Sequence, residues 1–90
     1  MQAVPKILIV EDNDNTHEGL KLVLSELDYR VEAVSTVSEA LQAISWFVPD
    51  VVVSDMLMPL QPGDVPNNSA GLELLKRVRA TKPEIKFLMI

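Results

Sequence analysis

Two short apolar runs in this sequence end in carboxylates. Ile7–Val10 leads directly into Glu11 and Asp12, and Val51–Val53 is followed two residues later by Asp55. Three consecutive β-branched residues are typical of a strand buried on both faces of a parallel sheet. Because an unpaired buried charge is costly, we expect these acids at the carboxyl-terminal tips of their strands, where a cation or polar groups can meet them. The pattern therefore predicts one acidic pocket.

Carboxylates that converge repel one another, and a hard divalent cation with oxygen ligands is the simplest resolution. Mg²⁺ suits a site of one or two direct carboxylates, a carbonyl and retained waters. We assign Asp12 and Asp55 as direct ligands, the main-chain carbonyl of Leu57 as a third, and Glu11 as a ligand through water. A carboxylate beside Mg²⁺ can also act as a nucleophile toward an activated phosphoryl group, since the metal neutralises charge on the incoming oxygens.

The chain that positions these acids alternates between two periodicities. Strands are expected at residues 6–10, 29–34, 50–54 and 85–90, and helices at residues 15–27, 37–47 and 71–80, which together indicate βαβ units and a parallel sheet. The half-polar second strand belongs at an edge and the apolar first and third strands inside. The predicted fold is therefore α/β with strand order 2-1-3-4, whose winding reverses at the crevice where the acids meet.

Local signals set the helix ends and the faces that the helices bury. Asp14 is our choice of N-cap for the first helix, and Thr36 with Glu39 has the spacing of a capping box for the second. Apolar residues at helical spacing predict the core-facing stripes. These stripes are Leu20, Val23, Leu24 and Leu27 in the first helix, Val37, Ala40, Leu41 and Ile44 in the second, and Leu72, Leu74, Leu75 and Val78 in the third.

Composition bounds the class of protein. Ninety residues make one domain, and a net charge of −5 argues against nucleic acid or anionic lipid as a partner. The absence of cysteine excludes disulfides and thiolate metal sites. No apolar run approaches the ~18 residues of a membrane span, and the N-terminus lacks the features of a secretion signal, so we expect a cytoplasmic protein.

Taken together, these residues resemble the receiver domain of two-component response regulators. The matching features are the acidic pair Glu11-Asp12 after the first strand, Asp55 with Met58-Pro59 after the third, and Gly71-Leu72-Glu73-Leu74-Leu75. The resemblance implies a flavodoxin-like sheet in which Asp55 accepts a phosphoryl group from a sensor histidine kinase or a phosphotransfer protein. It also implies that Glu11 and Asp12 hold Mg²⁺. A receiver of this kind is a switch and not an enzyme.

Two departures from the family pattern carry further expectations. Eleven residues, Leu60 to Ala70, separate Met58-Pro59 from Gly71, where the family has a shorter connection. We interpret this loop as an insertion, with Gly63 and Asp64 as a possible gate over the pocket. The resemblance also implies that residues 1–90 form a partial, C-terminally truncated receiver, without the family's fifth strand with its lysine and last helices. We therefore expect impaired phosphotransfer, and a dimer or swapped assembly through the fourth strand.

Other functions remain open beside the phosphorylated switch. A phosphorylation-independent interaction module with the same fold is the main alternative. A phosphohydrolase with an aspartate nucleophile is less favoured, because it generally needs a second acid two residues after the nucleophile, where this sequence has Leu57. His17, the one histidine, is expected to be exposed in the first turn of its helix and not to carry a phosphoryl group.

Overall fold

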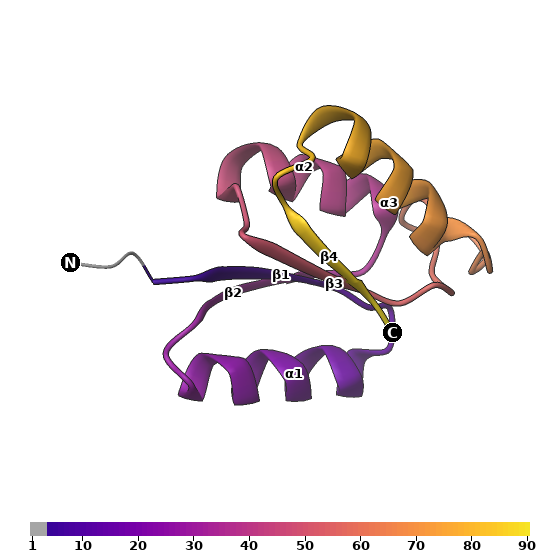
Figure 1. Ribbon diagram of the computed structural model, residues 1–90. Helices are drawn as coiled ribbons and strands as arrows, with labels where there is room; N and C mark the ends of the chain where they lie inside the picture. The colour runs from indigo at the N-terminus through magenta and orange to yellow at the C-terminus, as the bar shows by residue number, and fades with distance from the viewer. Residues whose placement is uncertain (1–3) are drawn as a thin grey trace.

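A four-stranded parallel sheet with helices on both faces forms the domain (Figure 1). The computed structural model describes residues 4–90. The strand order is β2-β1-β3-β4, which confirms the predicted fold and the edge position of β2. In chain order the elements are β1 (Lys6–Val10), α1 (Asp14–Glu26), β2 (Arg30–Val34), α2 (Val37–Phe47), β3 (Val51–Ser54), α3 (Ala70–Thr81) and β4 (Lys86–Met89).

The register of the sheet brings the carboxyl ends of the strands to one edge. Val10, the last residue of β1, pairs with Val34 of β2 and with Ser54 of β3, and Ser54 pairs with Met89 of β4. All pairings are parallel. Residues that follow β1 and β3 therefore emerge side by side, as the sequence predicts.

The main hydrophobic core lies between the sheet and the pair α2 and α3, which cover the same face (Figure 1). Leu8, Val10 and Val52 of the sheet are buried against apolar residues of the two helices, including Leu74 and Val78. Leu72 does not join them, because 43% of its surface is exposed. The predicted stripe of α3 is thus wrong at this position, since Leu72 stays on the surface of α3, where it borders a groove, and is not part of the core.

The opposite face of the sheet is covered by α1 alone (Figure 1). Leu20 and Leu24 of α1 are half-buried, but 58% of Val23 and 61% of Leu27 remain exposed. The prediction that all four bury is therefore wrong for Val23 and Leu27. A helix that packs on a sheet without a neighbouring helix buries only a narrow stripe, and within residues 4–90 nothing covers the flanks of α1.

The helix caps follow the expected chemistry with one shift. Asn13, and not Asp14, caps α1: its side chain accepts a hydrogen bond from the Thr16 amide at 3.1 Å. Asp14 is the first residue of the helix, where its negative charge interacts favourably with the positive end of the helix dipole. Thr36 caps α2 as predicted, since its Oγ1 accepts from the Glu39 amide at 3.1 Å; the reciprocal bond to Glu39 Oε1 comes from the amide of Ser35, at 3.2 Å, and not from that of Thr36.

The loop between β3 and α3 is pinned at its base and open at its tip. Met58 is fully buried, and its backbone pairs with that of Asn67 in an isolated antiparallel bridge. The first two amides of α2 donate to the carbonyls of Pro59 and Leu60, at 3.1 and 2.8 Å. Residues 60–69 are exposed. Among residues 4–90 no helix is both long and apolar enough to span a bilayer.

Candidate functional site

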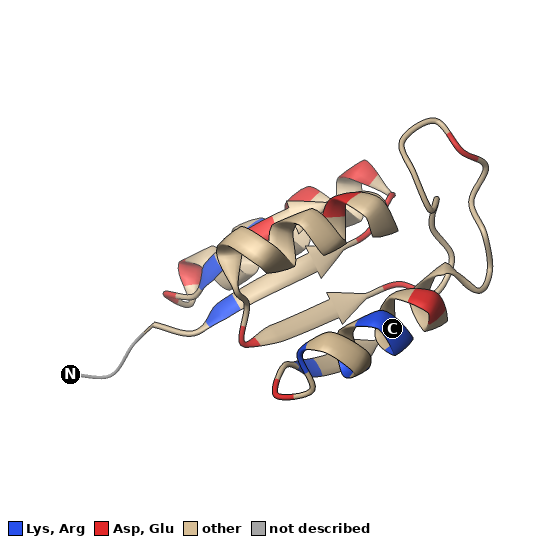
Figure 2. Cartoon of the chain, turned by 90° about the horizontal axis from the view of Figure 1, so that it is seen from above, with Lys and Arg blue, Asp and Glu red and all other residues tan. Residues whose placement is uncertain are grey.

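Three carboxylates meet at the carboxyl edge of the sheet. Glu11, Asp12 and Asp55 each offer an oxygen within 4.8 Å of the other two, although Asp55 is far from the pair in sequence. The sheet ladder sets this proximity, because the Glu11 amide donates to Val34 O and the Asp55 amide to Val10 O, each at 3.0 Å. Glu11 is buried, whereas Asp12 and Asp55 are half-buried. In Figure 2, acidic residues follow the ends of the two strands.

The connection from β1 to α1 fixes the first two acids. Glu11 Oε1 accepts a hydrogen bond from the Asn13 amide at 3.0 Å, and Asn13 in turn caps α1. His17 reaches back from the first turn of α1, with its Nδ1 3.1 Å from the Glu11 carbonyl oxygen. Because a carbonyl can only accept, Nδ1 carries the proton in this contact. His17 is half-buried rather than exposed as predicted, and no periodic pattern in the sequence signals this positioning contact.

The turn after β3 positions the third acid. Ser54 Oγ donates to the Asp55 carbonyl at 2.8 Å, and the Leu57 amide lies 3.4 Å from Asp55 Oδ1, which is a long hydrogen bond. The peptide of Leu57 is therefore beside the carboxylate. The role of the Leu57 carbonyl as a metal ligand stays a prediction.

Gly71 allows α3 to approach this turn. Its amide donates to Met56 O at 3.1 Å. A Cβ at Gly71 would lie 2.6 Å from Asp55 O, 2.7 Å from Met56 Cα and 2.8 Å from Met89 Sδ, distances that real side chains do not tolerate. The sequence marks Gly71 as the start of a helix but does not reveal this contact. The glycine is thus a positioning residue for the Asp55 turn.

The electrostatics of the cluster favour a cation. Burial raises the pKa of Glu11 above its ordinary value, and the negative charges of Asp55 and Asp12 raise the pKa further, while the Asn13 amide opposes them. Bringing three carboxylates this close costs free energy unless positive charge or protons offset it. The donor set is made of oxygen atoms alone, which hard cations such as Mg²⁺ prefer. The residues present therefore fit the predicted magnesium site.

The loop residues predicted to gate the site lie apart from the cluster. Gly63, with a φ of 88°, and Asp64 are exposed at the tip of the loop. The Asp64 amide donates to Gln61 O at 3.1 Å, which forms a local turn. The structure does not bring the Asp64 carboxylate among the three clustered acids. A gating role for Gly63 and Asp64 stays a prediction.

The fold and the cluster define a parallel α/β domain with a ligand site at its topological switch point. The family model for the response regulator receiver domain matches residues 7–90, and the chain belongs to this family. The family assignment made from the sequence motifs is confirmed. The chain is also similar to the response regulator MprA of Mycolicibacterium vanbaalenii, with 33% identity over 85 residues, which cover 94% of this chain and 33% of the relative.

Solved structures support the same assignment. The non-phosphorylated HemR receiver domain from Leptospira biflexa superposes with a TM-score of 0.79 and 32% identity, covering 94% of this chain and 62% of that chain. The chemotaxis response regulator CheY4 of Vibrio cholerae gives a TM-score of 0.80 and 27% identity, covering 97% and 68%. The chain spans about a third of the length of the curated relatives it matches.

Proposed function

We propose that Asp55 is the phosphoryl acceptor of a signalling switch. The single observation that supports this most is the cluster of Glu11, Asp12 and Asp55, whose oxygens lie within 4.8 Å of one another at the end of β3. Family membership supplies the donor, a phosphohistidine on a sensor histidine kinase or on a phosphotransfer protein. In the transfer, a carboxylate oxygen of Asp55 bonds to phosphorus, and the bond from phosphorus to the histidine nitrogen breaks. The nitrogen keeps the electron pair.

The surrounding residues have distinct proposed roles. Asp12, Asp55 and the Leu57 carbonyl would hold Mg²⁺ directly, and Glu11 would hold it through water. When bound, Mg²⁺ supplies positive charge that offsets the charge of the phosphoryl oxygens. His17 and Asn13 keep the Glu11 segment in place, and Gly71 keeps the Asp55 turn in place. The chain itself contributes the acceptor atom and its orientation.

The cellular setting and the kind of activity are proposed from the composition and the family. We propose that the domain acts as a phosphoryl-accepting switch in the cytoplasm and not as an enzyme in its own right. The net charge of −5 disfavours direct contact of this segment with nucleic acid phosphates. The partner expected from the family is a histidine kinase or a phosphotransfer protein.

Self-association through β4 is a separate part of the proposal. Within residues 4–90, β4 is an edge strand, and Leu88 and Ile90 on or beside it are exposed. An open, apolar strand edge is a template for pairing with a second chain. For a polypeptide of residues 1–90 alone, we expect a dimer in sedimentation velocity at tens of micromolar, which Leu88→Lys would reduce to monomer. A wild-type chain that is monomeric throughout this range would contradict the dimer.

The test of the proposed function uses separate readouts for metal and phosphate. Trp46 is a poor probe of metal binding, because it lies at the opposite end of the sheet from the acidic cluster. Its neighbour Phe47 accepts a hydrogen bond from Lys6, the first residue of β1, and Trp46 itself is 63% exposed. We therefore choose ¹⁵N NMR, in which Mg²⁺ should shift the amides of residues 11–13 and 55–57 and Asp12→Asn should abolish the shifts.

Acetyl phosphate should then add one phosphoryl group to Asp55 in the protein that contains this chain. The label should require Mg²⁺, be removed by hydroxylamine, as expected for an acyl phosphate, and be absent from Asp55→Asn. A protein that keeps its fold and binds neither Mg²⁺ nor a beryllofluoride mimic would instead be the phosphorylation-independent interaction module.

A further inference from the structure

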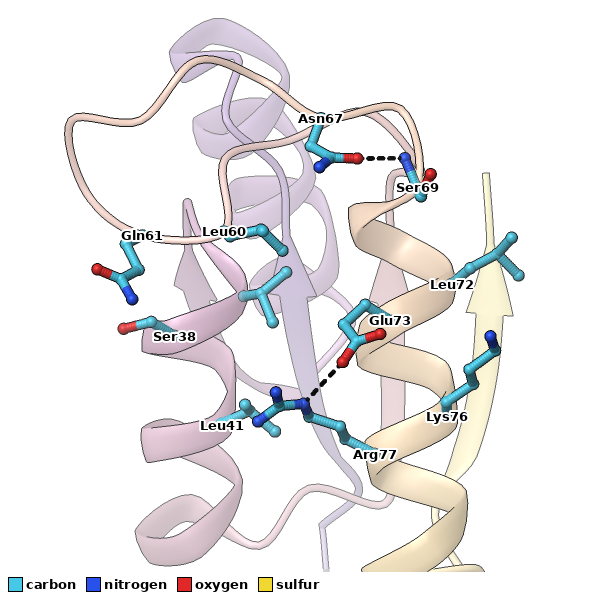
Figure 3. Close-up of a pocket in the computed structure, with 11 residues that line it drawn as sticks. Ser38, Leu41, Leu60, Gln61, Asn67, Ser69, Leu72, Glu73, Lys76 and Arg77 are labelled. Carbon is cyan, nitrogen blue, oxygen red and sulfur yellow. Dashed lines mark hydrogen bonds and ion pairs between the residues drawn. The ribbon is translucent and has the colours of Figure 1, made fainter.

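A groove lies between α2 and α3, away from the acidic cluster. Its volume is about 510 Å³, and apolar side chains from both helices and from the loop line it: Val37, Leu41, Leu60 and Leu72. Figure 3 shows the loop that follows β3 passing over one end of the groove, with Leu60 directed between the helices. None of Glu11, Asp12 and Asp55 lines this groove. It is therefore a second, independent concavity.

Two cations of α3, Arg77 and Lys76, line the groove; in Figure 3 Arg77 extends toward α2, whereas Lys76 lies on the side of α3 away from α2. Arg77 extends between the helices, and its Nε donates to Glu73 Oε1 at 3.0 Å (Figure 3). Glu73 thus orients the guanidinium while occupying one of its donors. In the described residues no acceptor bonds to the two terminal nitrogens of Arg77, and Lys76 makes no ion pair. The charged lining, two cations and one anion, is net positive on a chain of net charge −5.

We propose that this groove binds a small amphipathic organic anion, with an aromatic or aliphatic body and one oxyanion group. The apolar lining suits the body, and the two terminal nitrogens of Arg77 match the two oxygens of a carboxylate or two of the three oxygens of a sulfonate. The volume lies within the roughly 300–1,000 Å³ of small-molecule sites. A pocket of this size, bordered by the loop at one end, fits a small molecule better than it fits an extended helix of a protein partner.

The loop between β3 and α3 builds part of the groove wall. Leu60, Gln61, Asn67 and Ser69, all from the loop, form part of the wall. Asn67 is held by its backbone pairing with Met58, and its side chain accepts from the Ser69 amide at 2.7 Å. The wall is therefore built by contacts within the loop as well as by its bonds to α2. The extra loop residues singled out in the sequence thus acquire a role as the wall of a ligand site.

The probe for this proposal is 8-anilino-1-naphthalenesulfonate, with the uncharged N-phenyl-1-naphthylamine as its matched partner. Titrated into ¹⁵N-labelled protein, the sulfonate should shift amides of residues 37–41, 60–61 and 67–77. The double change Lys76→Gln with Arg77→Gln should weaken the sulfonate about tenfold or more, because it removes the charge-assisted hydrogen bonds. Binding of the uncharged analogue should change little. Lys76, Arg77 and Arg79 are all exposed on α3, so the three substitutions should be similarly tolerated by the fold. Because Arg79 does not line the groove, the control Arg79→Gln should leave the binding of both ligands unchanged.

Two outcomes would overturn the proposal. Shifts that cluster on Leu22, Val23 and Leu27 of α1 would show nonspecific binding to exposed apolar surface instead of the groove. Equal affinity for the two probes, unchanged by the double substitution, would show that the cations play no part in binding. Neither readout requires Mg²⁺ or phosphorylation, so failure here leaves the proposed function of Asp55 untouched.

Discussion

The two faces of the sheet differ sharply in how they are packed. On one face, α2 and α3 bury Leu74 and Val78 with Leu8 and Val52 in a continuous core. On the other face, α1 contributes no fully buried residue. The acidic cluster straddles this difference, because Asp55 follows a strand whose turn is packed against α3, whereas Glu11 and Asp12 lead into α1. Half of the site is therefore backed by the packed core, and the other half depends on polar contacts.

This asymmetry indicates where stability and adaptability are located. Segments with few buried apolar contacts open locally at lower free energy than core segments. The α1 side depends on the Asn13 cap and on the contact from His17 to the Glu11 carbonyl. A cation that joins Glu11 and Asp12 to Asp55 would tie the loosely packed half to the packed half. We therefore expect ligand binding at the cluster to protect α1 amides from hydrogen exchange more than α3 amides.

Large-to-small substitutions should give the largest difference between the faces. Leu74→Ala removes a fully buried side chain and should lower the free energy of unfolding by about 2–5 kcal/mol. Val23→Ala removes an exposed one and should cost less than about 0.5 kcal/mol. Denaturant unfolding of the two variants measures both values. Similar losses would contradict the asymmetry.

Two helical glycines provide a matched pair for the next effect. Gly71→Ala forces a methyl group against the Asp55 turn and should cost about 1–3 kcal/mol by overpacking, while also weakening Mg²⁺ binding. Gly19→Ala in α1 meets nothing within 4 Å and should stabilise the protein by up to about 1 kcal/mol through helix propensity. Thermal unfolding with and without Mg²⁺ separates the two. A neutral Gly71→Ala would show that α3 does not position the turn.

The helix caps should differ by less. Thr36→Ala breaks a buried cap that also engages Glu39, and it should cost about 1–2 kcal/mol. Asn13→Ala removes an exposed cap of α1 and should cost about 0.5–1 kcal/mol. Urea unfolding of each variant gives the comparison. A larger loss for Asn13→Ala would place more of the stability on the α1 side than the packing indicates.

The smallest predicted effect depends on pH. The pKa of Glu11 is raised above 4.5 in the folded state, so the folded protein binds the proton more tightly than the unfolded chain does. Without divalent cations, stability should therefore fall as the pH rises through 4.5 and on through the raised pKa. Glu11→Gln keeps the acceptor for the Asn13 amide and should remove this loss. If the two proteins keep a constant stability difference from acid to neutral pH, Glu11 is not the titrating group.

The sequence predicts the sheet and the acid positions well because both follow from periodicity. Apolar strands in a βαβ order leave few topologies, and a parallel register then places Glu11, Asp12 and Asp55 together without any tertiary information. The predicted cap, Asp14, is one residue away from the observed cap, Asn13. Neighbouring polar residues offer equivalent acceptors, and the backbone conformation of the connection determines which of them caps the helix.

Other features depend on contacts that no periodic pattern encodes. The exposure of Val23, Leu27 and Leu72 depends on which neighbouring elements reach them, and helical spacing alone does not report that. The contact of Gly71 with Asp55 depends on the approach of α3, and the groove under residues 60–69 depends on a loop without regular structure. Tertiary placement, and not propensity, determines these parts of the molecule.

The most direct test of the magnesium site at Asp55 is a Mg²⁺ titration of the wild type and of Asp55→Asn, monitored by isothermal titration calorimetry and by amide NMR. We expect one Mg²⁺ per chain in the wild type, with shifts at residues 11–13 and 55–57, and markedly weaker binding in Asp55→Asn. A wild type that keeps its fold but shows no Mg²⁺-dependent shift at these residues would contradict this site, as would equal binding by the two proteins.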